Sequence, residues 1–294
     1  MKRFFSLLCA ALAVISLSAC GGKEPSAPTE SSAAVSVHAP EVLEAPEPYV
    51  PSGTNPLTGL PMEPEYESLR PVAVMLNNLR EAQPQLGPSL ADIIYEVTAE
   101  GGITRMLALY QTLEGAQVGE LGSVRSCRPY YIELALGHDA LYVHAGGSPE
   151  AYSNLSEWKV DNMDGVNGGS DAEIFWRDKE RKKTMGYEHS LITSGENILE
   201  YLAGGRFSTE HRSNYTYGQK FVDDATPLNG ETAEHVRVKF SVYKTGTFEY
   251  DAQSRKYLAG QYDAAYVDGD TGEQVAVTNL LVLETNISVI SGDS

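Results

Sequence analysis

The chain has 294 residues and carries 22 basic and 40 acidic side chains, which give a formal net charge of −18 at pH 7. This length allows one large domain or two ordinary domains, each with a substantial hydrophobic core. The acidic balance makes nucleic acid and anionic membrane surfaces poor partners for the body of the protein.

The N-terminus has the pattern of a bacterial secretion signal. Two basic residues form a positive n-region, residues 4–17 are apolar, and small residues precede Cys20. The sequence Leu-Ser-Ala-Cys resembles a lipobox, so residues 1–20 are a predicted lipoprotein signal peptide with lipid on Cys20. An uncleaved anchor helix is the alternative, but the apolar run is short for a span of about 20 residues. The prediction places the protein on the extracytoplasmic face of the cell membrane.

Residues 21–53 are rich in Pro, Ser, Ala and Glu and show no periodic apolar pattern. This composition predicts a disordered tether. A flexible coil of this length would hold the body at least about 30 Å from the lipid. Turn-forming residues follow directly, so the first folded domain is predicted over residues 54–205.

The first domain begins with strand patterns that lack polar alternation. Residues 70–76 and 103–110 form two apolar runs of this kind. Residues 92–97 could form another strand, or Ser89 with Asp92 could cap a short helix, and the sequence leaves both open. Buried strands separated by helix signals favour an α/β or α+β fold, with a mixed sheet flanked by helices.

A helix, a strand and a histidine follow in order within residues 121–148. Pro129 suits the first turn of a helix, apolar residues recur at helical spacing after it, and Gly137 supplies a left-handed stop. Residues 140–143 are apolar and rich in strand formers, which predicts a short buried strand. The end of this strand delivers His144 to a turn.

A glycine turn and a helix start come next. Ser148 and Pro149 form an N-cap and first-turn pair for a helix that reaches Trp158. Helix starts and the carboxyl ends of strands favour anions, so two nearby arginines would complete an anion site if residues 121–126 fold back over the strand end. The alternative is that the arginines form surface ion pairs, the histidine is a core residue and the glycines are ordinary turn residues. The predicted ligand-binding residues are Arg125, Ser126, Arg128, His144, Gly146, Gly147, Ser148, Arg177 and His189.

Three carboxylates occur in and next to a predicted loop at residues 161–170. Asp161, Asp164 and Asp171 raise the possibility of calcium, but their spacing does not match an EF-hand loop. We therefore predict no metal and no cofactor.

A basic run and a capping pattern follow this loop. Residues 179–183 are expected to form a solvated face. Thr193 with Glu196 is a capping box that opens a helix, and Gly204 with Gly205 would end it.

Beyond residue 205 the pattern changes to alternation. Apolar and polar side chains alternate over residues 236–242, which is typical of a half-exposed strand. Residues 248–251, 262–268 and 275–283 continue in the same manner, with turn residues between them. Residues 206–294 are therefore predicted to be a smaller, mainly β second domain.

Six motifs in order resemble the YerB-like family of bacterial lipoproteins, whose two domains are of unknown function. They are NPLTG (55–59), RPVAVM (70–75), ADIIYE (91–96), EGGITR (100–105), VRS (124–126) and YVHAGGSP (142–149). The resemblance covers nearly everything from residue 55 onward. It implies a fold and a lipid-anchored address, but no established activity and no catalytic residue.

Two departures from the family pattern stand out. Cys127 stands where the resemblance leads us to expect a small residue, which a small apolar thiol can replace. The resemblance also implies a chain that continues past Ser294, so the second domain is expected to be incomplete. An unpaired apolar strand is then expected at residues 279–283.

Two functions fit these observations. The first is a binding or scaffold module that recognises an anionic component of the cell envelope or a partner protein. The alternative is an envelope hydrolase or transferase, with His144 or His189 as base and Arg125, Arg128 or Arg177 stabilising negative charge. The sequence contains no G-x-S-x-G elbow, P-loop, HExxH motif or cysteine-ligand spacing.

Overall fold

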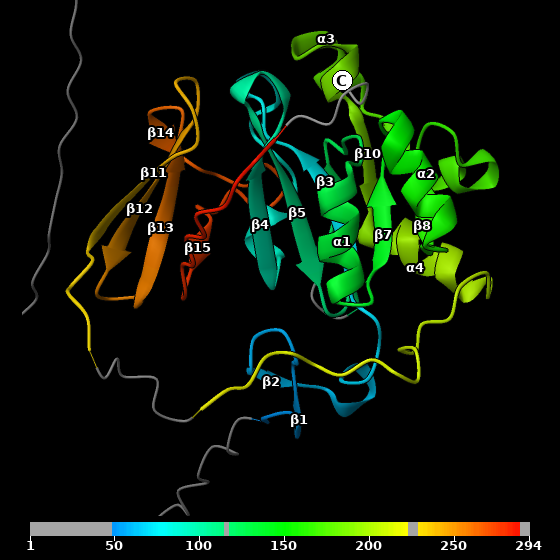
Figure 1. The fold of residues 1–294 in the computed structure, drawn as a ribbon. Coiled ribbons are helices and arrows are strands. Elements are labelled where there is room, and N and C mark those ends of the chain that lie inside the picture. Colours follow the sequence, from blue (N-terminus) through cyan, green and yellow to red (C-terminus); the bar gives the residue numbers. More distant parts are fainter. Residues whose placement is uncertain (1–48, 115–117, 223–228, 289–294) are drawn as a thin grey trace, which may run out of the picture. The chain divides into compact units, whose positions relative to one another are not determined.

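A computed structural model describes residues 49–114, 118–222 and 229–288 of the chain (Figure 1). The predicted signal peptide, Cys20 and residues 21–48 of the predicted tether lie outside the described residues. Within the described ranges, no helix combines the length and the apolar character that crossing a lipid bilayer requires.

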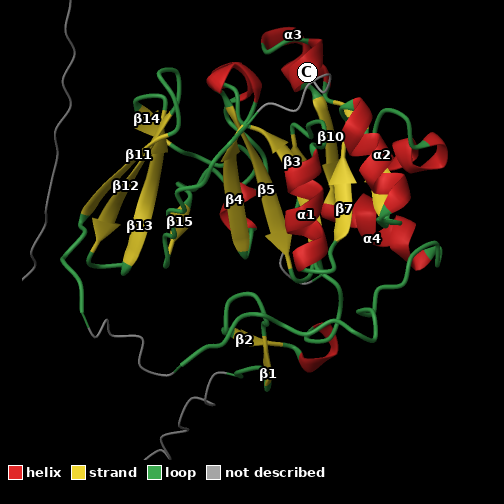
Figure 2. Cartoon of the chain, viewed as in Figure 1, coloured by secondary structure: helices red, strands yellow, loops and turns green. Residues whose placement is uncertain are grey.

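The central element is a five-stranded mixed sheet with the strand order β4-β5-β3-β7-β8 (Figures 1 and 2). Its strands are β3 (Val72–Asn77), β4 (Ile93–Thr98), β5 (Thr104–Tyr110), β7 (Leu141–His144) and β8 (Asn162–Asp164). Strand β5 pairs antiparallel with β4 and β3, whereas β7 pairs parallel with β3 and β8. The mixed sheet predicted from the sequence is confirmed.

Burial explains the apolar runs of this sheet. All six residues of β3 and all seven of β5 are buried, so neither strand has a face that is exposed to solvent. Residues 92–97, for which a helix and a strand were both open, lie mainly in β4 and pair with β5. Ser89 and Asp92 do not cap a helix, because Ser89 Oγ donates to Asp268 at 2.7 Å and Asp92 accepts the Gln111 amide at 2.6 Å.

Helices α1 (Pro129–Gly137) and α2 (Pro149–Glu157) cover one face of the sheet, and α4 (Gly195–Ala203) covers the other. The first core joins β3 and β5 to α1 and α2 through Ala73, Met75, Leu107, Leu109, Tyr131, Ile132, Ala151 and Leu155. The second core joins the alternate residues of β3 to α4 through Val72, Val74, Leu76, Ile198 and Leu202. Each face of the sheet therefore has its own apolar core.

Of two helix ends predicted from the sequence, one is confirmed and the other is wrong. Ser148 is the N-cap of α2, as predicted, and its Oγ accepts the Ala151 amide at 3.3 Å. The predicted left-handed stop at Gly137 is wrong, because Asp139 takes that conformation with φ of 49°. Aspartate tolerates this region of backbone space, and the Asp139 carboxylate is held by the Arg212 amide at 2.8 Å.

A separate three-stranded sheet has the order β6-β10-β9. Its strands are β6 (Glu120–Gly122), β9 (Trp176–Arg177) and β10 (Leu191–Ser194). Helix α4 follows β10 directly, and Ser194 is its N-cap, with Oγ accepting the Asn197 amide at 3.1 Å. The predicted capping box is wrong by one residue, because the buried Thr193 hydroxyl donates to the Ile174 carbonyl at 2.9 Å.

Helix α3 (Lys179–Thr184) contains the basic run that was expected to be solvated. Its three lysines are exposed, but Arg181 is buried. The Arg181 guanidinium donates to the carbonyls of Ala82 and Pro84 at 3.0 and 2.9 Å. This one basic side chain therefore anchors the helix to residues 82–84.

Short elements complete the first domain. Strands β1 (Gly53–Thr54) and β2 (Pro61–Met62) form an antiparallel pair. The 3-10 helices are η1 (Pro64–Tyr66), η2 (Arg80–Ala82), η3 (Pro88–Leu90), η4 (Glu100–Gly102), η5 (Gly169–Ile174) and η6 (Tyr187–His189).

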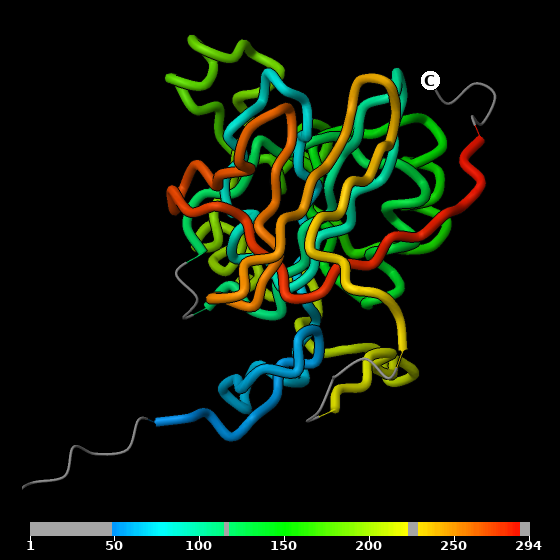
Figure 3. Tube along the Cα trace, turned by 90° about the vertical axis from the view of Figure 1, so that its left-hand side faces the viewer, coloured from blue at the N-terminus to red at the C-terminus, as the bar shows by residue number. Residues whose placement is uncertain are grey.

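The second region is a smaller antiparallel β structure, as predicted. Its strands are β11 (His235–Lys239), β12 (Thr245–Asp251), β13 (Lys256–Gln261), β14 (Ala264–Ala265) and β15 (Ala276–Val277). Figure 3, viewed from the side of this region, shows its strands in yellow to orange in front of the blue-green strands of the first domain. Ala259, Tyr266 and Val275 of this region belong to the same apolar core as β3 and α4.

Two strand predictions in this region are wrong. Residues 262–268 begin in a turn, because Tyr262 and Asp263 have φ of 55° and 64° and join β13 to β14. Two-residue hairpin turns of this kind usually carry glycine or asparagine. Tyr262 and Asp263 do not have this turn signal, so strand β13 was not predicted. Residues 279–283 are irregular rather than a strand, and Leu281 and Leu283 are 78% and 80% exposed.

Arg70 connects several segments at the start of β3. Its side chain is 2% exposed and donates to the Asp139 carbonyl and the Asp161 carboxylate, each at 2.7 Å. It also donates to the Ser208 carbonyl at 3.1 Å. These contacts join the turn after α1, the residue before β8 and the segment after α4.

We expect Arg70→Met to lower the free energy of unfolding by about 3 kcal/mol, because the buried Asp139 carboxylate would lose its buried cation. Chemical denaturation measures this change. Arg237→Met, on an exposed position of β11, is the matched control and should stay within about 0.5 kcal/mol of wild type. Equal stability of the two variants would show that Arg70 does not hold these segments together.

Candidate functional site

The segment 123–127 lies where strand β7 stops pairing with β3. β7 pairs only with Val72–Val74 of β3. Beyond that point the Asn77 amide donates to the Ser123 carbonyl at 2.9 Å, and the Arg125 amide donates to the Met75 carbonyl at 3.0 Å. The loop therefore runs along the second half of β3, next to the end of β7. The predicted anion site required this position of the loop.

The same loop also contacts the turn after β7. The Ala145 amide donates to the Arg125 carbonyl, and the Cys127 amide donates to the Gly146 carbonyl, each at 2.9 Å. Residues 125–127 and 144–148 are thus neighbours through their backbones.

His144 is fully buried, and both of its ring nitrogens have oxygen partners. Nδ1 lies 2.9 Å from the Gly146 carbonyl oxygen, and Nε2 lies 3.0 Å from Asn162 Oδ1. The Asn162 amide nitrogen donates to the Val160 carbonyl at 2.9 Å, which fixes its oxygen toward the imidazole. Neither nitrogen is therefore open to a substrate, and His144 is poorly placed to serve as a base.

Asp164 occupies the turn that was predicted to bind an external anion. Its Oδ1 accepts the amides of Gly146 and Val166 at 2.8 and 2.9 Å, and its Oδ2 accepts the Tyr152 hydroxyl at 2.6 Å. Burial favours the neutral acid, but the Tyr152 and Gly146 hydrogen bonds and nearby His144 bring the pKa of Asp164 below its ordinary value. The protein thus supplies its own anion at this position.

The remaining turn residues have structural roles. A Cβ on Gly147 would lie 2.5 Å from Cys127 Sγ, so glycine is needed for this close approach. Ser148 is occupied as the N-cap of α2. Burial raises the pKa of the Cys127 thiol to about 12, which keeps it protonated and unreactive.

Arg125 and Arg128 lie together with a third arginine, Arg105, which the sequence reasoning missed. Arg105 and Arg128 both contact the Glu100 carboxylate, the former through NH2 at 2.9 Å and the latter through Nε. Arg125 pairs with Glu188. We call Arg105, Arg125 and Arg128 the arginine cluster. Only the last two were predictable as a pair, because β5 brings Arg105 from elsewhere in the chain.

The backbone of the loop fixes two of these guanidinium groups. Arg105 donates to the Ser126 carbonyl at 2.8 Å, and Arg128 donates to the Cys127 carbonyl at 2.8 Å. Among the described residues, Nε of Arg105 and Nε of Arg125 are buried without a hydrogen-bond partner. Such orphaned donors are uncommon in folded proteins.

The arginines are covered, whereas their carboxylate partners are open to solvent. The Arg105 side chain is 5% exposed, against 40% for Glu100 and 57% for Glu188. Burial and the charges of Arg128 and Arg125 lower the pKa of Arg105, and Glu100 opposes this shift. The charge of Arg125 lowers the pKa of Glu188. The arginine cluster therefore carries three positive charges, which the carboxylates of Glu100 and Glu188 only partly neutralise.

His189 belongs to the same short turn as Glu188, the 3-10 helix η6, and Arg177 contacts this turn through Tyr187. The Arg177 guanidinium stacks 3.5 Å from the Tyr187 ring centroid and donates to the Tyr187 carbonyl at 2.6 Å. Asn77 Nδ2 donates a hydrogen bond to His189 Nδ1 at 2.9 Å. This orientation of the Asn77 amide follows because its Oδ1 accepts the Leu79 amide. Both residues support the turn that carries Glu188, and neither contacts the arginine cluster directly in the described structure.

The structure explains each carboxylate that raised the possibility of calcium. Asp161 pairs with Arg70, Asp164 binds the turn amides, and Asp171 pairs with Arg206 at 2.6 Å. In the part of the chain that the structure describes, no group of three or more His, Cys, Asp or Glu side chains is placed to hold a metal ion.

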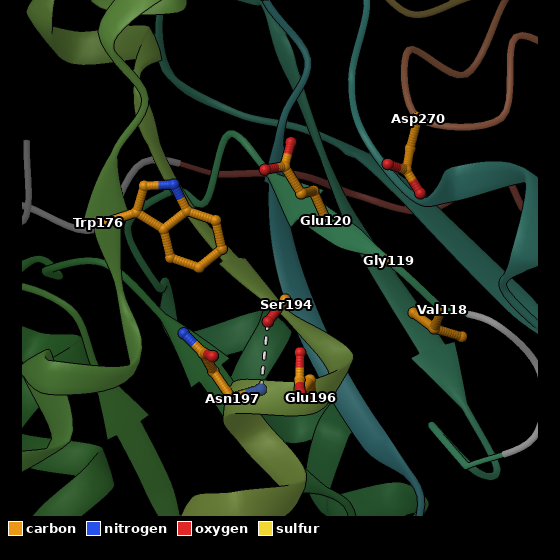
Figure 4. A pocket seen from close by; sticks show the side chains of 8 residues that line it. All are labelled: Val118, Gly119, Glu120, Trp176, Ser194, Glu196, Asn197 and Asp270. Atoms are coloured by element: carbon orange, nitrogen blue, oxygen red, sulfur yellow. Dashed lines mark hydrogen bonds between the residues drawn. The ribbon is translucent and has the colours of Figure 1, made fainter.

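An open cavity of about 510 Å³ lies elsewhere, beside β6 and the start of α4 (Figure 4). Trp176 and the carboxylates of Glu120, Glu196 and Asp270 line it. Burial, followed by the charges of Asp270 and Asp178, raises the pKa of Glu120. None of the predicted ligand-binding residues lines this cavity, and its acidic lining opposes an anionic ligand.

Two family models match the chain in the order of its two domains. Residues 57–208 match the model described as "Protein of unknown function (DUF3048) N-terminal domain", and residues 236–294 match that of the corresponding C-terminal domain. The chain therefore belongs to the family of two-domain proteins that these models define.

A relative with a solved structure agrees with this assignment. The chain is 34% identical over 242 residues to "Putative lipoprotein YerB" of Bacillus subtilis (strain 168), covering 81% of this chain and 69% of the relative. The crystal structure of YerB from B. subtilis matches with a TM-score of 0.62 and 33% identity, over 76% of this chain and 71% of that chain. The family resemblance and the α+β fold class are confirmed.

We expect Asp164→Ala to lower the free energy of unfolding at pH 7 by about 2–4 kcal/mol, because it leaves the amides of Gly146 and Val166 unpaired. The pKa of Asp164 is lower in the folded protein than its ordinary value of 3.8, so its charge stabilises the fold above about pH 4. This contribution is lost as the pH falls through the folded-state pKa.

The difference in stability between wild type and Asp164→Ala should therefore shrink below about pH 4. Denaturant titrations at several pH values measure it. Glu173→Ala, which removes an exposed carboxylate, is the control and should show little change at any pH. A difference that stays constant down to pH 3 would contradict the role of the Asp164 charge.

Proposed function

We propose that the chain is a lipoprotein, anchored through lipid on Cys20 at the extracytoplasmic face of the cell membrane. The lipobox-like sequence and the name of the YerB relative support this proposal. We further propose that the folded body binds an anionic component of the cell envelope at the arginine cluster.

The arginine cluster is the observation that carries the binding proposal. It places three guanidinium groups together in a chain whose formal net charge is −18. Guanidinium groups match the paired oxygens of phosphate and carboxylate groups. The buried Nε donors of Arg105 and Arg125 add hydrogen-bonding capacity that the described protein leaves unused.

Glu100 and Glu188 would act as internal counter-ions that a ligand displaces. Both carboxylates are far more exposed than the arginines they contact, so they can rotate into solvent. A phosphate or carboxylate of the ligand would then replace them at Arg125 and Arg128. The guanidinium groups are covered, so they need a counter-charge, and the anionic group of the ligand would supply it when the glutamates move away.

Tyr187 supports a polymeric rather than a small ligand. Tyr187 is 61% exposed and precedes Glu188 in the chain, and its ring stacks on the Arg177 guanidinium. A flat apolar surface next to a positive cluster suits a repeating unit that carries both an apolar face and an acidic group. The predicted residues Arg177 and His189 would then hold this surface in place.

We expect Arg125→Lys and Arg128→Lys each to weaken binding about tenfold, nearly as much as the alanine variants, because lysine keeps the charge but loses the planar fork. Two probes separate the chemistry of the ligand: polyphosphate for phosphate groups and polygalacturonate for carboxylates. Isothermal titration with each probe at fixed salt measures the effect.

Glu188→Gln should have the opposite effect on binding, because it removes the carboxylate that competes with the ligand for Arg125 and keeps the side-chain length. It should tighten binding, whereas Arg237→Lys, an exposed control on β11, should leave it unchanged. Wild-type affinity in the folded Arg125→Lys and Arg128→Lys proteins for both probes would refute the binding proposal.

For the anchor, we expect Cys20→Ala to abolish membrane attachment in the native host, because this change removes the thiol that receives lipid. Cell fractionation with detection of the protein measures it. Cys127→Ala is the control, since this thiol is buried in the folded body. Membrane attachment that persists in the Cys20→Ala protein would refute the lipid anchor.

A further inference from the structure

A lysine of the second region is fully buried against the first domain. Lys244 lies directly before β12 and its side chain is 1% exposed, which is rare for this residue type. Its Nζ lies 3.0 Å from Glu96 Oε1 on β4 and also contacts Gln261 Oε1. The Tyr262 ring covers the amine, with its centroid 4.9 Å from Nζ. The amine is thus held in a closed, partly aromatic environment.

The carboxamide of Asn78 meets the same glutamate oxygen. Asn78 follows β3 directly and is fully buried, and its Nδ2 donates to Glu96 Oε1 at 2.9 Å. The amine of Lys244 and the amide nitrogen of Asn78 share one acceptor atom, so they lie less than about 6 Å apart. Thr104 Oγ1 donates to this oxygen as well, at 2.6 Å, and fixes its position.

The carbonyl side of Asn78 is also prepared for nucleophilic attack. Its Oδ1 accepts Gln85 Nε2 at 2.7 Å and Gln83 Nε2 at 3.4 Å. Two donors on a carbonyl oxygen draw electron density from the carbon and stabilise the negative charge that develops when a nucleophile adds. An ordinary buried ion pair between Lys244 and Glu96 would not require this arrangement around a neighbouring carboxamide.

We propose that Lys244 and Asn78 form an intramolecular amide bond, with Glu96 as the catalytic proton carrier. The neutral Nζ attacks Cγ of Asn78, and the electron pair of the carbonyl moves to Oδ1, where Gln85 and Gln83 stabilise it. Glu96 takes a proton from Nζ and delivers it to Nδ2. The Cγ–Nδ2 bond then breaks, ammonia leaves, and the Glu96 carboxylate is regenerated, so the step needs no oxidant, metal or co-reactant.

The environment favours this step. Burial lowers the pKa of Lys244 even though Glu96 opposes the shift, which increases the fraction of nucleophilic amine. The closed site also keeps out water that would compete for the same carbonyl carbon. The product would tie the end of β3 covalently to the second region, independently of the anion site proposed above.

Mass spectrometry of the full chain tests this proposal. In a Cys20→Ala background, which avoids lipid heterogeneity, the denatured protein should be lighter than its sequence mass by one ammonia, about 17 Da. A peptide map should join the peptide carrying Asn78 to the one carrying Lys244, and trypsin should not cleave after Lys244. Glu96→Gln and Lys244→Met should restore the full mass, and Lys239→Met, at an exposed position of β11, should keep the loss.

Several outcomes would overturn it. Wild-type protein at its full sequence mass, with trypsin cleavage after Lys244, would show a non-covalent ion pair only. A loss of ammonia that persists in Lys244→Met would show that Asn78 reacts with its own backbone instead. A peptide map that joins Lys244 to Gln261 would refute Asn78 as the acceptor. The map of the wild-type protein decides the question even where a variant fails to fold.

Discussion

Strand β3 is buried on both faces, so its backbone groups need hydrogen-bonding partners along both edges. β5 supplies one edge, while the other is shared between β7 and the loop that carries Arg125. This requirement fixes the loop before any ligand is considered. Two asparagines at the end of the strand also position side chains of both sites. Asn77 forms a hydrogen bond with His189, and Asn78 forms one with Glu96. Both proposed sites therefore depend on one strand end.

Much of the first domain could be predicted from the sequence, because its signals are local. The apolar runs of β3 and β5 and the Ser148 cap each depend on neighbouring residues alone. The failures involve residues without such signals. Asp139, and not the expected Gly137, is the left-handed residue after α1. The turn at Tyr262 and Asp263 lacks the usual turn residues, so the end of the preceding strand could not be predicted. Tertiary contacts, which no local pattern encodes, stabilise these conformations.

In the candidate site, too, some features have local sequence signals and others depend on tertiary contacts. Arg125 and Arg128 could be paired from their spacing, but Arg105 joins them only because β3 and β5 align it opposite Asn77. Parallel pairing of β7 with β8 sets Asp164 opposite His144, and this carboxylate accepts the turn amide of Gly146, which was predicted to bind a ligand. Strand register, rather than residue type, therefore separates the arginine cluster from the histidine turn.

The close approach of Cys127 and Gly147 has a consequence for sequence variation within the family. The two residues are bridged through their backbones, and the thiol fills the volume that a side chain at position 147 would need. Positions 127 and 147 thus behave as one steric unit of fixed total volume. A smaller residue at position 127 would open room for alanine at 147, whereas a larger one would clash with the turn even if glycine were kept. Any residue other than glycine at position 147 should therefore occur only together with a residue smaller than cysteine at position 127.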